Sequence, residues 1–116
     1  MDNKFGETIR ELRINKDLGL REFAKQLEIT PAYLSNIERG KFNPPSEEKI
    51  IRIAEKLGAD SNFLLRLAKK VPPEIQKAFK QDEVIAEYAP TFLKIAKNFS
   101  KKDWKEVINL VKNKLD

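Results

Sequence analysis

Apolar residues recur at helical spacing along the whole chain, and no stretch shows the strict alternation of a β-strand. Within residues 3–69, five segments place their apolar side chains three or four positions apart. The second segment, for example, has apolar positions at Leu20, Phe23 and Leu27, which lie on one face of a helix. Because each segment is only about 8 to 13 residues long, the five must pack together to be stable. The pattern predicts an all-α fold.

Residues that favour helix ends stand between these segments. Thr30 precedes Pro31, which predicts an N-cap followed by a proline in the first turn of a third helix. Gly40 is placed to end that helix in the left-handed conformation. Further N-caps are expected at Ser46 for the fourth helix and at Asp60 for the fifth. The end signals and the apolar spacing therefore predict the same helices.

A pair of prolines at positions 72 and 73 marks the clearest boundary in the chain. It divides the sequence into a helical domain over residues 1–70 and a helical extension over residues 71–116. Within the extension, Asp82 is expected to cap a helix that Pro90 should kink or split, because proline removes a helical hydrogen bond and clashes with the preceding turn. The predicted fold class is an all-α bundle of five helices followed by a short helical C-terminal extension.

The last helix of the extension carries a strong apolar stripe. Ser100 and Asp103 have the spacing of a capping box that begins this helix. A segment of this size can scarcely bury so much apolar surface alone. We therefore expect the stripe to be a dimer or partner interface, with packing on the first five helices as the alternative. The interface residues are Trp104, Val107, Ile108 and Val111.

The most informative stretch is residues 19–40, in which two short helices are joined by a tight connection. Their lengths and turn placement are those of a helix-turn-helix, whose second helix can lie in the major groove of DNA. Leu34 and Ile37 would face the core. The side chains on the other faces suit base recognition, since Asn36 can pair with adenine and Ala32 offers a methyl group to thymine.

Over roughly residues 3–69, the sequence resembles the phage-repressor and xenobiotic-response-element family of helix-turn-helix regulators. The resemblance rests on an ordered set of motifs, namely Leu20-Arg21-Glu22-Phe23-Ala24, Ile29-Thr30-Pro31, Tyr33-Leu34-Ser35, Ile37-Glu38-Arg39-Gly40, Pro44-Pro45 and Ile53-Ala54-Glu55-Lys56-Leu57-Gly58. It implies a five-helix, repressor-like DNA-binding domain, usually a homodimer on a pseudo-palindromic operator of double-stranded DNA. The recognition helix would be the one at residues 30–40.

The resemblance also implies individual DNA-binding residues. Arg21, at the start of the second helix, would contact the phosphate backbone. The remaining candidates are the N-cap and base-reading positions of the recognition helix and the backbone contacts that follow it: Thr30, Ala32, Tyr33, Ser35, Asn36, Arg39, Lys41 and Asn43. Glu38 matches a position that is usually structural, so we do not expect it to contact DNA.

Two residues depart from the family pattern. Gly19 stands where a Ser or Thr usually caps the second helix, and this cap is only a few tenths of a kcal/mol poorer. Glu28 stands where the tight turn usually has glycine, and a left-handed conformation there would cost about 1 kcal/mol. Either the turn differs slightly or packing absorbs that cost. Neither departure changes a DNA-facing side chain.

The composition argues against an enzyme. The 116 residues include no cysteine and no histidine, which excludes disulfides, thiol nucleophiles and cysteine-based metal sites and removes the commonest general base. Paired acids such as Glu47-Glu48 stand at expected helix N-termini, where they favour the helix dipole. We therefore expect no catalytic residue, no metal site and no cofactor.

Charge and hydropathy bear on partners. Lys and Arg exceed Asp and Glu by 23 to 18, a mild preference for polyanions that is spread over both segments. The first residues lack the apolar stretch of a signal peptide, and no apolar run could span a bilayer. A cytoplasmic protein that does not associate with membranes is expected.

The function expected from the sequence is sequence-specific DNA binding by a transcriptional regulator, most simply a repressor. The alternative is a protein-interaction module, such as an antitoxin or an anti-repressor target. In that case the C-terminal helices would bind a partner protein and DNA binding would be secondary. A third hypothesis is a helix-turn-helix fold that has lost DNA binding.

Overall fold

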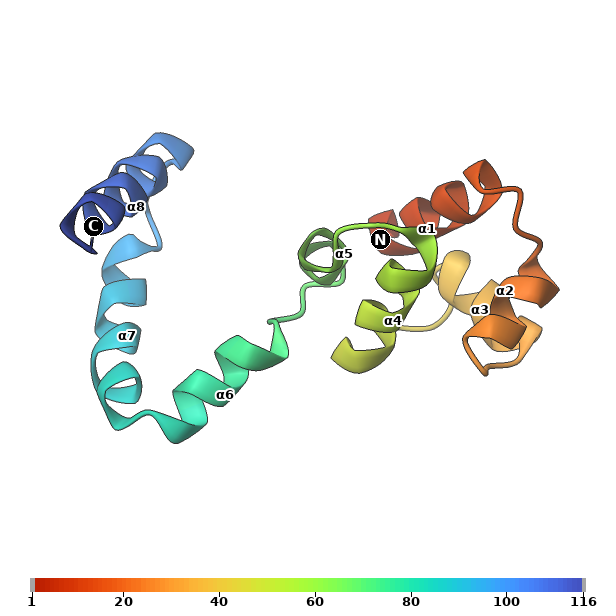
Figure 1. Cartoon of the computed structure of the whole chain (residues 1–116), viewed down its shortest axis with the longest axis horizontal. Helices are drawn as coiled ribbons and strands as arrows, with labels where there is room; N and C mark the ends of the chain where they lie inside the picture. The colour runs from red at the N-terminus through yellow and green to blue at the C-terminus, as the bar shows by residue number, and fades with distance from the viewer. Residues whose placement is uncertain (1, 116) are drawn as a thin grey trace. The chain divides into compact units, whose positions relative to one another are not determined.

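A computed structural model describes residues 2–115, and over this range it is helical with no strand (Figure 1). The helices are α1 (Lys4–Asn15), α2 (Leu20–Gln26), α3 (Pro31–Glu38), α4 (Glu47–Leu57), α5 (Ser61–Leu67), α6 (Pro73–Gln81), α7 (Glu83–Ala96) and α8 (Lys101–Leu115). The predicted all-α fold is confirmed. The chain forms two compact units that divide between Gln76 and Lys77, within α6. The boundary expected from the sequence lies earlier, in the connection between α5 and α6.

The core of the first unit takes apolar side chains from all five of its complete helices. Its buried members are Phe5, Ile9, Phe23, Ala24, Leu27, Leu34, Ile37, Ile50, Ile53, Ala54, Leu57, Leu64, Leu65 and Ala68. The apolar residues of α5 differ in burial. Phe63 is 40% exposed, and the centroid of its ring lies 5.8 Å from Arg66 Cζ. Leu65, by contrast, is buried in the core.

The helix ends form as the sequence predicts. The Thr30 hydroxyl accepts a hydrogen bond from the Tyr33 N–H at 3.1 Å, and the Asp60 carboxylate accepts one from the Asn62 N–H at 2.9 Å. The Ser46 hydroxyl caps α4 at a longer 3.4 Å. Gly40 follows α3 with a φ of +75°, in the left-handed region where glycine is favoured. These caps supply partners for backbone groups that the helices themselves leave free.

A buried ion pair joins α1 to the C-terminal end of α3. Arg13 Nε donates to Glu38 Oε2 at 2.8 Å, and Arg13 Nη2 donates to Glu38 Oε1 at 2.9 Å. Arg13 Nη1 also donates to the Leu18 carbonyl oxygen at 2.9 Å, which adds the α1–α2 connection to the same cluster. Arg13 is 8% exposed and Glu38 5%. The hydrogen bonds to Glu38 raise the pKa of Arg13 above its usual value. Glu38 is therefore structural, as the resemblance implied.

The backbones of α1 and α3 also approach closely. A Cβ atom at Gly6 would lie 2.5 Å from the Ile37 carbonyl oxygen and 2.6 Å from that of Glu38. At the same point, Asn3 Nδ2 donates a hydrogen bond to the Glu38 carbonyl oxygen at 3.0 Å. Only glycine leaves room at position 6 for this approach. The hydrogen bond from Asn3 then holds the end of α3 against the first turn of α1.

The second unit has a small aromatic cluster of its own. The rings of Phe92, Phe99 and Trp104 meet edge to face, with centroids 5.5 to 6.2 Å apart. Ala96 is buried beside them at the end of α7. Reciprocal hydrogen bonds between Ser100 and Asp103 begin α8, which confirms the predicted capping box.

Of the kink or split expected at Pro90, the split does not occur. The Asp82 carboxylate caps the helix as predicted, accepting from the N–H groups of Val84 and Ile85, and α7 continues through Pro90 to Ala96. Proline leaves the carbonyl four residues earlier, that of Ala86, without its helical donor. Ala86 and Pro90 are both exposed, so water can supply the missing hydrogen bond.

Replacing Arg13 with methionine should destabilise the first unit strongly, because the Glu38 carboxylate would stay buried without its partner. Breaking a buried pair in this way costs about 3–5 kcal/mol. The free energy of unfolding, measured by urea denaturation followed by far-UV circular dichroism, should fall by that amount. As a control, Glu28→Gln removes the acid of an exposed pair with Arg52 (3.6 Å) and should change stability by less than about 1 kcal/mol. Equal effects of the two variants would contradict a structural role for the buried pair.

Candidate nucleic-acid interface

The turn between α2 and α3 is a Schellman motif with a non-glycine residue at its left-handed position. The Glu28 N–H donates to the Lys25 carbonyl at 3.1 Å, and the Ile29 N–H donates to the Ala24 carbonyl at 3.0 Å. Glu28 has a φ of +58°, and Ile29 packs against the core. The turn therefore has the geometry of a Schellman motif although Glu28 replaces glycine. The packing of the surrounding residues offsets the conformational cost at Glu28.

The α3 helix has one buried side and one accessible side. Leu34, Ile37 and Glu38 are buried in the first unit. None of the candidate DNA-binding residues is buried: Arg21, Thr30, Ala32, Arg39, Lys41 and Asn43 are exposed, while Tyr33, Ser35 and Asn36 are half-buried. Except for Arg21 on α2, these candidates lie on α3, at its N-cap or in the loop that follows it.

The loop after α3 is tied to the helix by its backbone. The N–H groups of Lys41 and Phe42 both donate to the Asn36 carbonyl oxygen, at 2.9 and 3.2 Å. The Lys41 side chain is thereby kept close to the end of α3. Among residues 2–115, no carboxylate oxygen lies within 4.0 Å of the cationic nitrogens of Arg21, Arg39 or Lys41. These three charges are available to an anionic partner.

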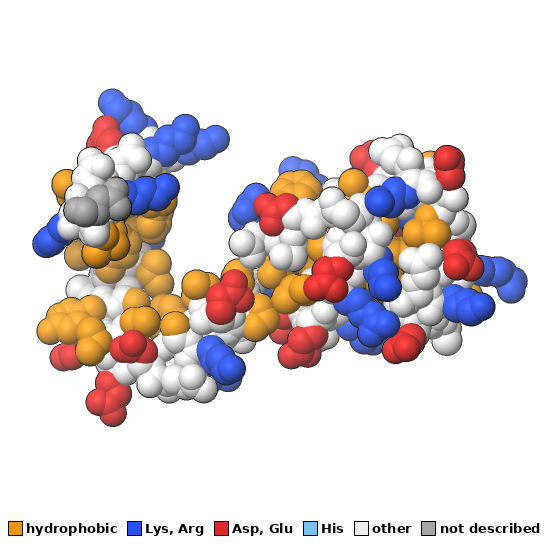
Figure 2. Space-filling model, viewed as in Figure 1, with side chains coloured by type: hydrophobic (Ala, Val, Ile, Leu, Met, Phe, Trp, Pro, Cys, Tyr) orange, Lys and Arg blue, Asp and Glu red, His pale blue; other side chains and the backbone are white. Residues whose placement is uncertain are grey.

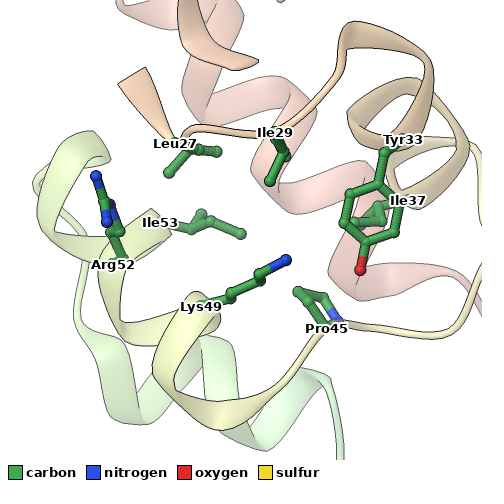
Figure 3. Close-up of a pocket in the computed structure, with 8 residues that line it drawn as sticks. All are labelled: Leu27, Ile29, Tyr33, Ile37, Pro45, Lys49, Arg52 and Ile53. Atoms are coloured by element: carbon green, nitrogen blue, oxygen red, sulfur yellow. The ribbon is translucent and has the colours of Figure 1, made fainter. Parts of the chain in front are cut away.

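Tyr33 is held at the edge of the core. Its ring centroid lies 5.9 Å from that of Phe42 and 5.1 Å from Lys49 Nζ, which reaches across from α4 (Figure 3). A small apolar hollow lies beside the Tyr33 ring and is lined by Leu27, Ile29, Tyr33, Ile37, Pro45, Lys49, Arg52 and Ile53. The ring is thus partly structural, and its exposed part remains free to contact a ligand.

Sequence reasoning missed Lys49 and Arg52 as neighbours of the site. Arg52 Nη2 donates to the Gln26 carbonyl at 3.3 Å and pairs with the Glu28 carboxylate at 3.6 Å. Both side chains come from α4, and they reach α2 and α3 only because the connection after Gly40 folds α4 back against them. The helical pattern of α4 marks these positions as polar but does not show which helix they face.

The described part of the chain offers little for other kinds of site. No group of three acidic side chains in residues 2–115 is arranged to hold a metal ion. None of the helices in that range has the length and hydropathy of a membrane-spanning segment.

Residues 6–70 match the helix-turn-helix domain family. This chain belongs to that family. Over 61 residues it is 39% identical to the ImmF control region 10 kDa protein of Bacillus phage phi105, covering 53% of this chain and 67% of that protein. The family confirms the expectation of a helix-turn-helix DNA-binding transcriptional regulator rather than an enzyme.

Several solved structures of regulators match this chain. The biofilm regulator SinR in complex with DNA is 30% identical, with a TM-score of 0.49, and the match covers 53% of this chain and 97% of that one. The clp gene regulator ClgR from Corynebacterium glutamicum is 34% identical, with a TM-score of 0.48 and coverage of 56% and 83%. A chain of the SinR/SinI complex is 23% identical with a TM-score of 0.50 and covers 95% of this chain and 96% of its own length. This last match supports the fold of a helix-turn-helix bundle followed by further helices.

Replacing Glu28 with glycine should stabilise the protein by about 1 kcal/mol, because glycine adopts the left-handed conformation without the clash of a Cβ atom. The gain should appear as a higher urea midpoint with an unchanged denaturant slope. Glu28→Ala is the matched control, since it removes the same carboxylate and keeps the Cβ atom. An equal gain in both variants would assign the effect to the lost charge instead of the backbone.

Proposed function

We propose that this regulator reads the major groove of an operator with α3 and acts as a repressor. The observation that carries the proposal is the way α3 is held. Its buried side is fixed by Leu34, Ile37 and the Arg13–Glu38 pair, which leaves its other side free to enter a groove. An α-helix with its side chains fits the width of the major groove. Occupying an operator is sufficient for repression, and it requires no further activity of the chain.

Specificity would come from the uncharged side chains of α3. Asn36 has the donor and acceptor that a bidentate contact to adenine requires, and Ala32 offers its methyl group to thymine. Ser35 and the exposed part of Tyr33 would complete the base contacts. Around them, Arg21, Thr30, Arg39, Lys41 and Asn43 would bind phosphates and fix the register of the helix. This division assigns affinity mainly to the cations and sequence preference to the neutral residues.

The second unit would join two copies into a dimer. Ile108 and Val111 on α8 are 48% and 49% exposed, and Leu115 is 81% exposed. Apolar side chains are visible at the surface of this unit in Figure 2. Soluble monomers rarely leave so many apolar side chains together on one small surface. Two copies joined there could place two α3 helices on half-sites about 34 Å apart in a pseudo-palindromic operator.

The same apolar surface supports the second candidate function, in which a partner protein binds it and controls the regulator. Trp104 and Val107 are half-buried beside the aromatic cluster and would form the floor of either interface. The two candidates differ in one measurable property, because only the first makes the isolated protein a dimer.

Asn36→Ala should weaken binding to the selected operator by about 1–3 kcal/mol and relax the preference at one base pair. The operator is first selected from a random DNA pool with the wild-type protein, and affinities are then measured on it and on its single-base variants. Arg21→Gln is the control, because loss of a phosphate contact should weaken binding to all sequences and lower the salt slope by about one. An Asn36→Ala loss that is equal on every sequence would remove this residue from the base contacts.

The double variant Ile108→Glu and Val111→Glu should convert a dimer into monomers in sedimentation experiments, since four buried charges in one interface would be strongly unfavourable. Asn113→Glu introduces a charge on the same helix away from the stripe and should leave the dimer intact. An unchanged far-UV circular dichroism spectrum would show that the helices persist in the variant. A wild-type protein that is monomeric at all concentrations would contradict the dimer and favour the partner-binding alternative.

A further inference from the structure

A second hollow lies beside α3, on the side that faces α1 and α2. Its walls are Arg10 and Arg13 from α1, Leu20 from α2, and Ser35, Glu38 and Arg39 from α3. It shares no lining residue with the apolar hollow beside Tyr33, which is formed by α3, α4 and the connections that precede them. The two hollows therefore border α3 on different sides.

The net charge of this second hollow comes from Arg10 and Arg39, because its other two charged residues are paired with each other. Both oxygens of the Glu38 carboxylate are taken by Arg13, so these two residues contribute no net charge. Arg10 and Arg39 are exposed, and within residues 2–115 neither has a carboxylate oxygen within 4.0 Å of its guanidinium nitrogens. Glu7 and Glu11 share a neighbouring surface with Arg10 but do not pair with it. Two guanidinium groups, neither in an ion pair, thus line one space.

This arrangement suits a phosphate group. Guanidinium groups bind phosphate oxygens through pairs of parallel, charge-assisted hydrogen bonds. Leu20 contributes an apolar side chain to the wall. A phosphodiester of a DNA strand and a free phosphate ion share this chemistry.

We propose that Arg10 and Arg39 together bind one backbone phosphate of the operator in this hollow. The proposal rests on groove reading by α3. Ser35 and Arg39 are four residues apart and therefore lie along the same side of α3. When α3 occupies a groove, the strand that borders the groove on this side passes the hollow. Arg10 is thus a phosphate contact from α1 that the helix-turn-helix motif itself does not include.

The test is the salt dependence of DNA binding by Arg10→Gln. Each phosphate contact contributes about −0.9 to the slope of log affinity against log salt. The variant should lose about one unit of slope, so the ratio of wild-type to variant affinity should fall about threefold between 50 and 200 mM salt. The loss should be equal on operator and non-operator DNA. Arg10→Lys, which keeps the charge, should recover most of the slope.

Arg66→Gln is the matched control. Arg66 is also an exposed arginine of the first unit, but it lies on α5 against the Phe63 ring and outside the hollow. This variant changes the net charge equally and should keep the wild-type slope. If the two variants behave alike, the effect is one of overall charge and the phosphate contact is wrong.

A second arm of the experiment distinguishes the source of the phosphate. Inorganic phosphate is titrated into the free protein while the amide NMR signals of Ser35 and Arg39 are followed. Saturable binding of this ion, with a salt slope that Arg10→Gln leaves unchanged, would assign the hollow to a free anion and overturn the DNA contact. A wild-type protein that selects no operator would instead overturn groove reading by α3 together with this contact.

Discussion

The buried pair of Arg13 and Glu38 determines where α3 can lie in the first unit. The helix has eight residues, too few to be stable without tertiary contacts. Three hydrogen bonds from Arg13 join its C-terminal end to α1 and to the α1–α2 connection. A buried charge is costly unless it is paired, so a displaced α3 would leave two ions without partners. The pair therefore favours a single position for the helix, and the close approach at Gly6 is possible only in that position.

The same pair has an electrostatic consequence for DNA binding. Glu38 is the acidic residue of α3, and an unpaired carboxylate beside the groove would repel phosphates. Because Arg13 neutralises it, the exposed Arg39 and Lys41 act without local opposition. The chain as a whole carries a net charge of only +5, spread over both units. The positive surface thus depends on where the acids are paired more than on how many bases there are.

Most helices of the first unit could be predicted, because their ends depend on nearby residues. Contacts between residues far apart in the sequence could not be predicted. Caps such as Thr30 and Asp60 act within three residues, so the sequence alone shows the helix that each one begins. Arg13 and Glu38 are 25 residues apart, and nothing near either residue indicates the other. Lys49 was missed for the same reason, since its position against Tyr33 depends on the packing of α4 on α3. The apolar spacing also does not show that the Phe63 side chain is 40% exposed. It does not show either that α7 accommodates Pro90 on an exposed face.

The apolar stripe of α8 does two different things in the second unit. Trp104 packs edge to face with Phe92 and Phe99, so part of the stripe is used within the unit itself. Ile108 and Val111 are left about half exposed, because so small a unit cannot bury the whole stripe. Association through that remainder would use residues of the second unit, whereas α3 belongs to the first unit. Joining two copies there would make the second operator contact intramolecular and raise affinity without adding any contact to DNA. A short recognition helix with few base contacts gains most from such an arrangement.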